Sequence, residues 1–321
     1  MEKAILNFAK QFTYEPKIEN IVTHKKYDSF VLTGMGGSHL AADIVNTLQP
    51  KIDLTIHHDY GIPEISNEKK QKSLFIASSY SGNTEEVVEG FNKAKESDMD
   101  VAVLATGGTL IDLAKSHHTP YIQIPETGIQ PRSALGFSLL ALLKIIGEDT
   151  LLKKMQKLQN TINPTLLKPK GEYIAKQLQE RTPIIYSSQK NISIAYNWKI
   201  KCNETAKIPA FYNSIPELNH NEMNGFDLKE QSQHLGKQFC VILLSDNTDH
   251  PKNIKRMSVV KELYETRNIL VIDIPLTGKS TEEKIFTSIL IADWTALSLA
   301  QYYNHEAEQV PMIEEFKKKI E

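Results

Sequence analysis

Short apolar runs alternate with amphipathic stretches through the first half of this chain, and this alternation constrains its fold most strongly. The runs have the length of buried strands, and the stretches between them show helical spacing of apolar residues. The runs are Val31–Thr33, Leu54–His57, Leu74–Ala77, Val101–Leu104 and Tyr121–Ile124. Strands separated by helices form a parallel sheet with helices on both faces. The pattern therefore predicts an α/β fold of three layers, with a mainly parallel sheet between helices.

The second half of the chain repeats this plan in the order of its elements. We expect strands near Ile184, over Phe239–Leu244 and over Ile269–Ile274, and helices over 192–202, 254–264 and 282–302. The order of elements is what predicts a second subdomain of the same architecture, because the halves share too little sequence to show a repeat.

Domain boundaries follow from the change of pattern in the middle of the chain. We expect residues 1–150 to form the first subdomain with an N-terminal helix. Residues 151–170 are polar and helical, with Pro164 and Pro169 as breaks, and are expected to be a linker. Residues 171–321 then form the second subdomain, which ends in a basic amphipathic helix.

A hydroxyl-rich turn, Ser79–Thr84, follows the Leu74–Ala77 run and precedes a helical pattern that begins at Glu85. A turn between strand and helix directs unpaired N–H groups and the positive end of the helix dipole at one point, which suits a phosphate. The turn has no lysine, so it is not a P-loop. A single small phosphoester is the expected ligand of Ser79, Ser81 and Thr84; the alternative is a turn that only caps a helix.

The loop Gly34–His39 follows the first strand and invites a dinucleotide interpretation, with Asp59 as the ribose-binding acid. His39 stands where that motif needs its third glycine, so we expect no NAD or other cofactor. Gly36 and Gly37 instead allow the backbone to approach a ligand closely, and Ser38 helps to hold it. Two loops at the carboxyl ends of neighbouring strands then converge on one anion.

Composition limits the partners of this protein. The 321 residues carry a formal net charge of −2, which gives no reason to expect nucleic acid or an anionic membrane. The most apolar segment, 134–146, is too short to cross a bilayer, and the N-terminus lacks the features of a signal peptide. Cys202 and Cys240 show no metal-ligand spacing. We expect a cytoplasmic protein that binds a small molecule and no metal.

Three further residues complete a set that could perform acid–base chemistry. Arg132 begins the long apolar helix, and Glu204 and His220 lie near loops. For Glu204 or His220 alone, a solvated surface position is the commoner explanation, and for Arg132 alone it is a residue that only happens to stand at a helix start. Together with two phosphate-binding turns, a cation, a carboxylate and an imidazole are the smallest set of groups that could catalyse proton transfer on an anionic sugar.

These motifs, in this order, resemble the sugar isomerase (SIS) superfamily, and most closely its bifunctional phosphoglucose/phosphomannose isomerase branch. The segments that carry the resemblance are Gly34–Ser38, Ser79–Thr84, Pro131–Ser133, Asn203–Glu204 and Glu217–Glu222. The resemblance implies two SIS subdomains with the active site between them, in a homodimer. It implies that the protein interconverts glucose 6-phosphate and fructose 6-phosphate, and also mannose 6-phosphate, in glycolysis and gluconeogenesis.

The resemblance also implies roles for individual residues. Ser38, Ser79, Ser81 and Thr84 would bind the phosphate, and Glu204 would move a proton between C1 and C2 through a cis-enediol. His220 of the other subunit would help to open the sugar ring, with Lys317 contacting the ring oxygen. Arg132 is the natural group to stabilise the enediolate.

A non-catalytic SIS protein that senses a sugar phosphate is the alternative. Sensors of this kind carry an effector segment, and neither residues 1–28 nor the residues after Pro311 resemble a helix-turn-helix with a basic face. The sequence therefore favours the enzyme.

Overall fold

The computed structural model describes residues 1–20 and 25–320, which form two compact units. The N-terminal unit comprises Asn7–Thr161, and the C-terminal unit comprises Ile162–Glu321 together with the first six residues, Met1–Leu6. The segment expected as a linker, 151–170, contains most of α7 (Asp149–Gln156), η4 (Lys157–Asn160) and the first residues of α8 (Pro164–Leu178).

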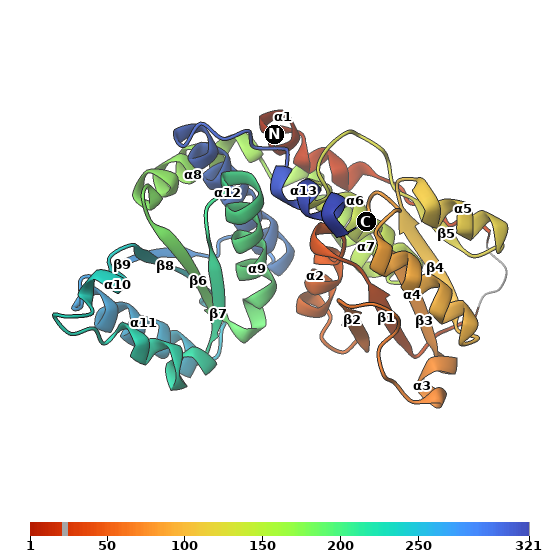
Figure 1. Cartoon of the computed structure of the whole chain (residues 1–321), viewed down its shortest axis with the longest axis horizontal. Coiled ribbons are helices and arrows are strands. Elements are labelled where there is room, and N and C mark those ends of the chain that lie inside the picture. Colours follow the sequence, from red (N-terminus) through yellow and green to blue (C-terminus); the bar gives the residue numbers. More distant parts are fainter. Residues whose placement is uncertain (21–24, 321) are drawn as a thin grey trace. The chain divides into compact units, whose positions relative to one another are not determined.

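The described residues of the N-terminal unit form a sheet of five parallel strands in the order β2-β1-β3-β4-β5. Helices lie along it in Figure 1. The strands are β1 (Ser29–Thr33), β2 (Leu54–His57), β3 (Ser73–Ser78), β4 (Asp100–Ala105) and β5 (Tyr121–Gln123). β1 and β3 are buried along their whole length, as strands in the middle of a parallel sheet must be.

Helices cover this sheet through apolar faces. The helices are α2 (Leu40–Leu48), α3 (Asn67–Lys72), α4 (Glu85–Glu96), α5 (Gly108–Ser116), α6 (Leu135–Ile145) and α7, with 3₁₀ turns at η1 (Phe8–Thr13), η2 (Gly36–Ser38) and η3 (Pro131–Ser133). Val87 and Phe91 of α4 pack with Phe75 of β3 in one buried cluster. The sequence pattern missed α3 and α5.

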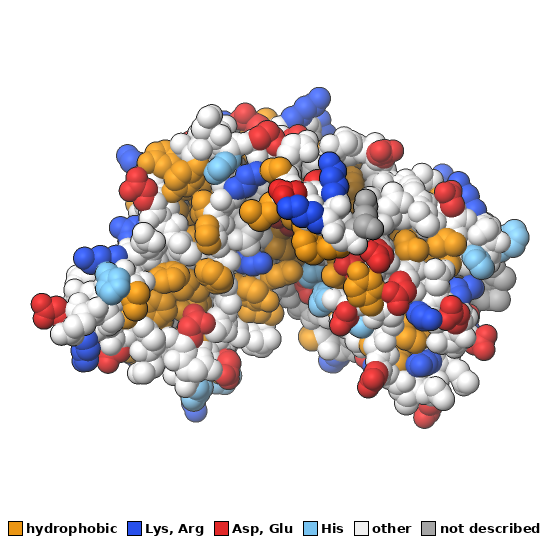
Figure 2. Space-filling view, in the orientation of Figure 1, with side chains coloured by type: hydrophobic (Ala, Val, Ile, Leu, Met, Phe, Trp, Pro, Cys, Tyr) orange, Lys and Arg blue, Asp and Glu red, His pale blue; other side chains and the backbone are white. Residues whose placement is uncertain are grey.

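The C-terminal unit contains a second parallel sheet, in the order β7-β6-β8-β9 among the described residues. Its strands are β6 (Thr182–Ser188), β7 (Phe211–Ile215), β8 (Phe239–Ser245) and β9 (Leu270–Pro275). β7 was not predicted, because polar Asn213 and Ser214 interrupt its apolar residues. It is an edge strand with Phe211 and Tyr212 exposed, in a region where Figure 2 shows hydrophobic side chains at the surface.

The helices of the C-terminal unit include a long buried one, α12 (Thr281–Tyr302), that contacts α8 closely. The others are α1 (Glu2–Leu6), α9 (Ile192–Lys201), α10 (Gln233–Gly236), α11 (Pro251–Glu265) and α13 (Pro311–Ile320). None of the helices in the described part of the chain combines the length and apolar character needed to cross a membrane.

Pro169 does not break α8, contrary to the sequence expectation; it lies inside the helix. Packing against α12 outweighs the loss of one backbone hydrogen bond. The two helices approach closely at Gly171, where a Cβ atom would lie 2.3 Å from Cβ of Trp294. Trp294 in turn donates from Nε1 to the Pro164 carbonyl (2.8 Å), which fixes the start of α8.

The two sheets share one topology. The order β2-β1-β3-β4 in the first corresponds to β7-β6-β8-β9 in the second, so the predicted repeat of architecture is confirmed. In each sheet the strand order reverses direction beside the first strand, between β1 and β3 or between β6 and β8. Ligands of such sheets bind at this switch point, beyond the carboxyl ends of the strands.

We expect Gly171→Ala to destabilise the protein. Alanine normally favours a helix over glycine by about 1 kcal/mol, but here the added methyl would collide with Trp294. Overpacking should lower the free energy of unfolding by about 1–3 kcal/mol, measured by urea denaturation followed by circular dichroism. Lys176→Ala, on the exposed face of the same helix, should change it by less than about 0.5 kcal/mol. A Gly171→Ala protein as stable as the wild type would contradict the close approach.

Candidate functional site

The loops after β1 and β3 are hydrogen-bonded to each other at the switch point of the N-terminal sheet. The Ser78 hydroxyl donates to the Ser38 carbonyl (2.9 Å), and the Ser38 hydroxyl accepts from the Tyr80 backbone N–H (3.0 Å). Ser38 ends η2, whose Gly36 is exposed and has φ of +53°. The structure thus brings together the two loops in which the sequence predicts phosphate ligands.

Within the turn Ser79–Thr84, the hydroxyl groups differ in exposure. Ser79 is fully buried, and its Oγ accepts from the Gly82 N–H (3.1 Å) and contacts Thr84 Oγ1 (2.8 Å). Ser81 is exposed and its Oγ accepts from the Asn83 N–H (3.3 Å). Ser79 therefore shapes the turn, whereas Ser81 presents its hydroxyl group at the surface.

The residues that follow β4 pack against the Ser79–Thr84 turn and form hydrogen bonds with it. Gly82 has φ of +74°, and a Cβ atom there would lie 1.8 Å from the Gly107 carbonyl oxygen. Asn83 Oδ1 accepts from both the backbone N–H (2.9 Å) and the hydroxyl (3.0 Å) of Thr109. Glycine and asparagine in the motif are thus required by the contact with the neighbouring loop. Sequence reasoning missed this role of Gly107–Thr109.

Arg132 comes to the same loops through a close backbone contact. A Cβ atom at Gly37 would lie 2.8 Å from Arg132 N and 2.9 Å from Pro131 C, so only glycine fits between the two segments. Arg132 is 1% exposed. The structure therefore groups Gly36, Gly37 and Ser38 with Pro131–Ser133 and with the Ser79–Thr84 turn.

Gln11 anchors the segment that carries Arg132, a role that no local pattern could reveal. Its Nε2 donates to the Ser133 carbonyl (2.7 Å), and its Oε1 accepts from the N–H of Gly136 (2.9 Å) at the start of α6. Gln11 is buried and lies 122 residues before Ser133. A side chain from η1 thus accepts from an N–H group that the helix start leaves unpaired and also holds the carbonyl just before the helix.

His39 occupies the position where a dinucleotide-binding loop needs glycine. The buried His39 donates from Nδ1 to Asp43 (2.8 Å), and its ring contacts that of His58 at 4.3 Å between centroids. His58 donates from Nδ1 to the Gly34 carbonyl (3.3 Å). Burial and the neighbouring His39 lower the pKa of His58. Bulky imidazoles therefore fill the space in which dinucleotide binding requires close packing of helix and strand.

Glu204 lies in the C-terminal unit on η6 (Cys202–Ala206), a π-helical turn that continues α9. Lys207 ends this turn with φ of +57°; its backbone N–H donates to the Cys202 carbonyl and its Nζ to the Glu204 carbonyl (3.2 Å). Glu204 is half-buried. The first residue of the turn, Cys202, is buried, and burial raises the pKa of its thiol to about 12. π-helical turns are rare in proteins, and a large share of those that occur lie at functional sites.

His220 is exposed at the end of η7 (Glu217–His220), in a segment anchored on both sides. Leu218 is fully buried before it. After it, the Glu222 carboxylate accepts from the Tyr186 hydroxyl and from Asn213 Nδ2 (2.6 Å). Burial is the main cause that raises the pKa of Tyr186 far above its usual range, so the phenol stays protonated as the donor. The turn is therefore held while its imidazole faces solvent.

Lys317 lies on α13, where none of the described residues is buried. Its Nζ lies 3.0 Å from Glu314 Oε1 within the helix. Met312 is 82% exposed and Phe316 61% exposed, and Figure 2 shows lysine and hydrophobic side chains side by side over this helix. Glu204, His220 and Lys317 thus belong to the C-terminal unit, on separate elements, whereas the predicted phosphate ligands and Arg132 belong to the N-terminal unit.

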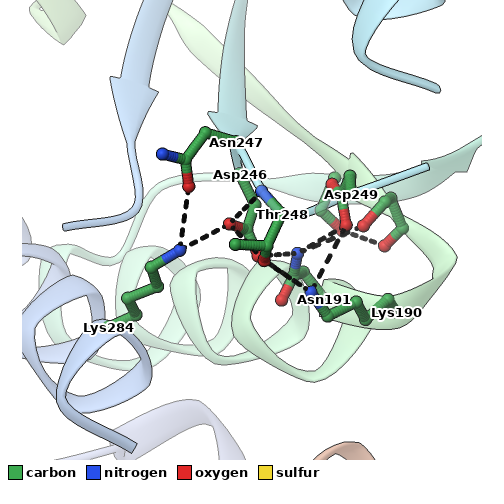
Figure 3. A network of polar contacts seen from close by, with 9 residues as sticks. Lys190, Asn191, Asp246, Asn247, Thr248, Asp249 and Lys284 are labelled. Carbon is green, nitrogen blue, oxygen red and sulfur yellow. Dashed lines mark hydrogen bonds and ion pairs between the residues drawn. The ribbon is translucent and has the colours of Figure 1, made fainter. Parts of the chain in front are cut away.

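The switch point of the second sheet, between β6 and β8, carries carboxylates, whereas the first switch point carries hydroxyl and N–H groups (Figure 3). Here the loop after β8 supplies buried carboxylates, and cations come from the loop after β6 and from α12. Asp246 accepts from Lys284 (2.7 Å), Lys190 (3.1 Å) and the Thr248 N–H (3.0 Å). The chain's own carboxylate takes up the donors at this position, so a second phosphate site is not favoured.

Among the described residues, no three His, Cys, Asp or Glu side chains gather so that they could hold a metal ion. The polar groups of the two loops at the first switch point are hydroxyl and backbone N–H groups, which suit an anion.

The chain resembles solved phosphosugar proteins in fold. It matches glucosamine-6-phosphate deaminase from Thermotoga maritima over 97% of both chains, with a TM-score of 0.70 and 15% identity. It also matches the C-terminal domain of glucosamine-fructose-6-phosphate aminotransferase from Francisella tularensis, with a TM-score of 0.65 and 15% identity over 96% of this chain and 95% of that one. Residues 168–320 match the family described as the bacterial phospho-glucose isomerase C-terminal SIS domain. The fold is therefore of the SIS class, as predicted.

Comparison with named relatives identifies the family within this class. The chain is 32% identical to a bifunctional phosphoglucose/phosphomannose isomerase of Caldicellulosiruptor bescii over 100% of this chain and 98% of the relative. It is 28% identical to one of Aquifex aeolicus (99% and 97% covered), and 28% identical to a D-glucosamine-6-phosphate 4-epimerase of Sulfolobus acidocaldarius (95% and 93%). The chain belongs to the bifunctional phosphoglucose/phosphomannose isomerase family, which confirms the resemblance seen in the sequence.

The carboxylate network of the second switch point predicts how stability depends on pH. Burial alone would raise the pKa of Asp246, but hydrogen bonds from Lys284, Thr248 and Lys190 outweigh it and hold the pKa well below its ordinary range. Such a carboxylate stabilises the fold above its unfolded pKa of about 3.9, and this contribution is lost as the pH falls toward the folded value. Asp246→Asn should lower the free energy of unfolding at pH 7 by roughly 1.5–3 kcal/mol and flatten its fall below about pH 4.

Asp249→Asn is the matched control for this prediction. Burial raises the pKa of Asp249, so its ionisation contributes no stability that acid could remove. Urea unfolding at a series of pH values should therefore show the wild-type fall in acid for Asp249→Asn. The same steep fall in Asp246→Asn would contradict the assignment.

Proposed function

We propose that this protein interconverts glucose 6-phosphate and fructose 6-phosphate, and that it also accepts mannose 6-phosphate. The observation that carries the proposal is the full-length similarity to isomerases so named, in a chain whose loops after β1 and β3 are joined by hydrogen bonds into one hydroxyl-rich cradle. A sugar phosphate is a ligand that such a cradle suits. No observation favours a non-catalytic sensor.

The proposal assigns the phosphate end of the substrate to the N-terminal unit. Ser81 and Thr84, together with backbone N–H groups at Gly36, Gly37 and the start of α4, would donate to the phosphate oxygens. Ser38 and Ser79 support the cradle through the hydrogen bonds that join and shape its loops. Neutral donors and a helix dipole bind one monoester dianion without the lysine that a nucleotide's terminal phosphates require.

The proposal assigns the proton transfer to Glu204. Its carboxylate would remove the proton from C2 of the open aldose and return it to C1, while a proton moves between O1 and O2, so that a cis-enediol lies between aldose and ketose. Arg132 would stabilise the enediolate, because its guanidinium is always protonated. Return of the proton to the other face of C2 would yield mannose 6-phosphate. This chemistry uses no cofactor.

Ring opening is assigned to His220 and Lys317. We propose that the protein is a homodimer in which His220 acts in the partner's site. The anchored turn that presents an exposed imidazole, the exposed edge strand β7 and the exposed apolar residues of α13 support this arrangement. With these substrates the protein would act in the cytoplasm, in glycolysis and gluconeogenesis.

Glu204→Gln tests the assignment of the base. The amide cannot take up a proton, so kcat should fall by about a thousandfold while KM changes little. The assay supplies fructose 6-phosphate and couples glucose 6-phosphate formation to NADPH; mannose 6-phosphate is followed separately. Glu262→Gln, an exposed carboxylate on α11, should keep wild-type activity. Full turnover by Glu204→Gln would reject this base. Epimerisation of glucosamine 6-phosphate at C4, without ketose formation, would instead favour the activity named for the Sulfolobus relative.

Ser81→Ala tests the phosphate cradle independently. Ser81 would contact the phosphate in the ground state and the transition state alike, so its loss should raise KM with kcat nearly unchanged. A tenfold rise in KM corresponds to about 1.4 kcal/mol. Ser97→Ala at the opposite end of α4 should leave both constants unchanged. A fall in kcat at constant KM would argue against phosphate binding at Ser81.

A further inference from the structure

A buried ion pair lies directly before the turn that carries Glu204. Lys201 Nζ is 2.8 Å from Asp293 Oδ1, with the side chains 0% and 3% exposed. Lys201 is the last residue of α9, and η6 begins at the next residue. Asp293 lies on α12, whose buried face packs against both α9 and η6.

We propose that Lys201 and Asp293 are positioning residues that fix the orientation of the Glu204 turn; this inference rests on the proposed function. The turn is held at its far end by Lys207 and by Asn203 Nδ2, which donates to the Ile208 carbonyl (3.0 Å). Lys201 holds the near end. The turn is thus fixed on both sides of Glu204, and the near side is attached to the longest helix of the unit.

An ion pair is an unusual choice if stability alone were required. Removing two charges from water is costly, and apolar residues of similar volume are often as stabilising as a buried pair. A close ion pair between one lysine and one carboxylate, buried between two helices, instead favours the one register of those helices in which the two charges meet. That register matters here because a π-helical turn departs from the regular helical hydrogen bonding, so its neighbours must define its geometry.

A second polar contact joins the same helices farther from the turn. Trp198 Nε1 donates to Ser288 Oγ (3.0 Å), in the turn of α9 before Lys201. It therefore provides an internal comparison: a contact across the same interface, with the same two helices, that does not adjoin η6.

The test replaces the pair with apolar residues of similar size. Lys201→Met and Asp293→Leu alone each leave a buried charge without its partner and should reduce thermal stability. The double variant should recover stability, yet its kcat should stay at least tenfold below wild type with KM for fructose 6-phosphate within twofold. A double variant that is both stable and fully active would show that the pair serves packing only and would overturn the inference.

Two controls separate the possible outcomes. Ser288→Ala should lower thermal stability while kcat remains at the wild-type level, which shows that lost stability alone does not reduce turnover. Glu204→Gln is assayed in parallel. If Glu204→Gln is inactive and the double variant has full kcat, the positioning role fails while the proposed base stands. If Glu204→Gln is fully active, the proposed base fails, and the positioning role fails with it.

Discussion

The hydrogen bonds between Ser38 and the β3 loop are the interactions on which the candidate site depends. They join two loops that lie side by side because β1 and β3 are adjacent parallel strands whose carboxyl ends meet at one edge of the sheet. Neither loop alone forms the cradle. The close backbone contact at Gly37 then brings the segment Pro131–Ser133, which carries the buried Arg132, to the same loops.

The two sheets share one strand order but carry different polar groups at their switch points. At the first switch point, the two loops carry hydroxyl groups, of which that of Ser81 lies on an exposed residue. At the second, Asp246 receives hydrogen bonds from Lys190 and Lys284, so the chain supplies its own anion (Figure 3). The predicted site residues of the C-terminal unit, Glu204 and His220, lie on other elements, η6 and η7. The same strand order thus carries two different sets of polar groups at its switch points.

Much of the site follows from local sequence, but its supports do not. The Ser79–Thr84 turn could be predicted because its strand, turn and helix signals are contiguous. The anchoring by Gln11, Thr109 and Glu222 could not, because each contact joins residues that only the folded chain brings together. For the same reason the sequence did not predict β7 or the continuous helix α8. β7 forms by pairing with β6, and α8 continues through Pro169 because it packs against α12.

The sequence by itself determined the α/β class, the repeated order of elements and the family, because hydrophobic periodicity and short motifs are properties of neighbouring residues. Only the tertiary structure decided which loops meet, that Ser79 is buried while Ser81 is exposed, and that Lys201 pairs with Asp293 beneath the Glu204 turn. These features arise from contacts across tens of residues. Packing and burial set them, and no local pattern records them.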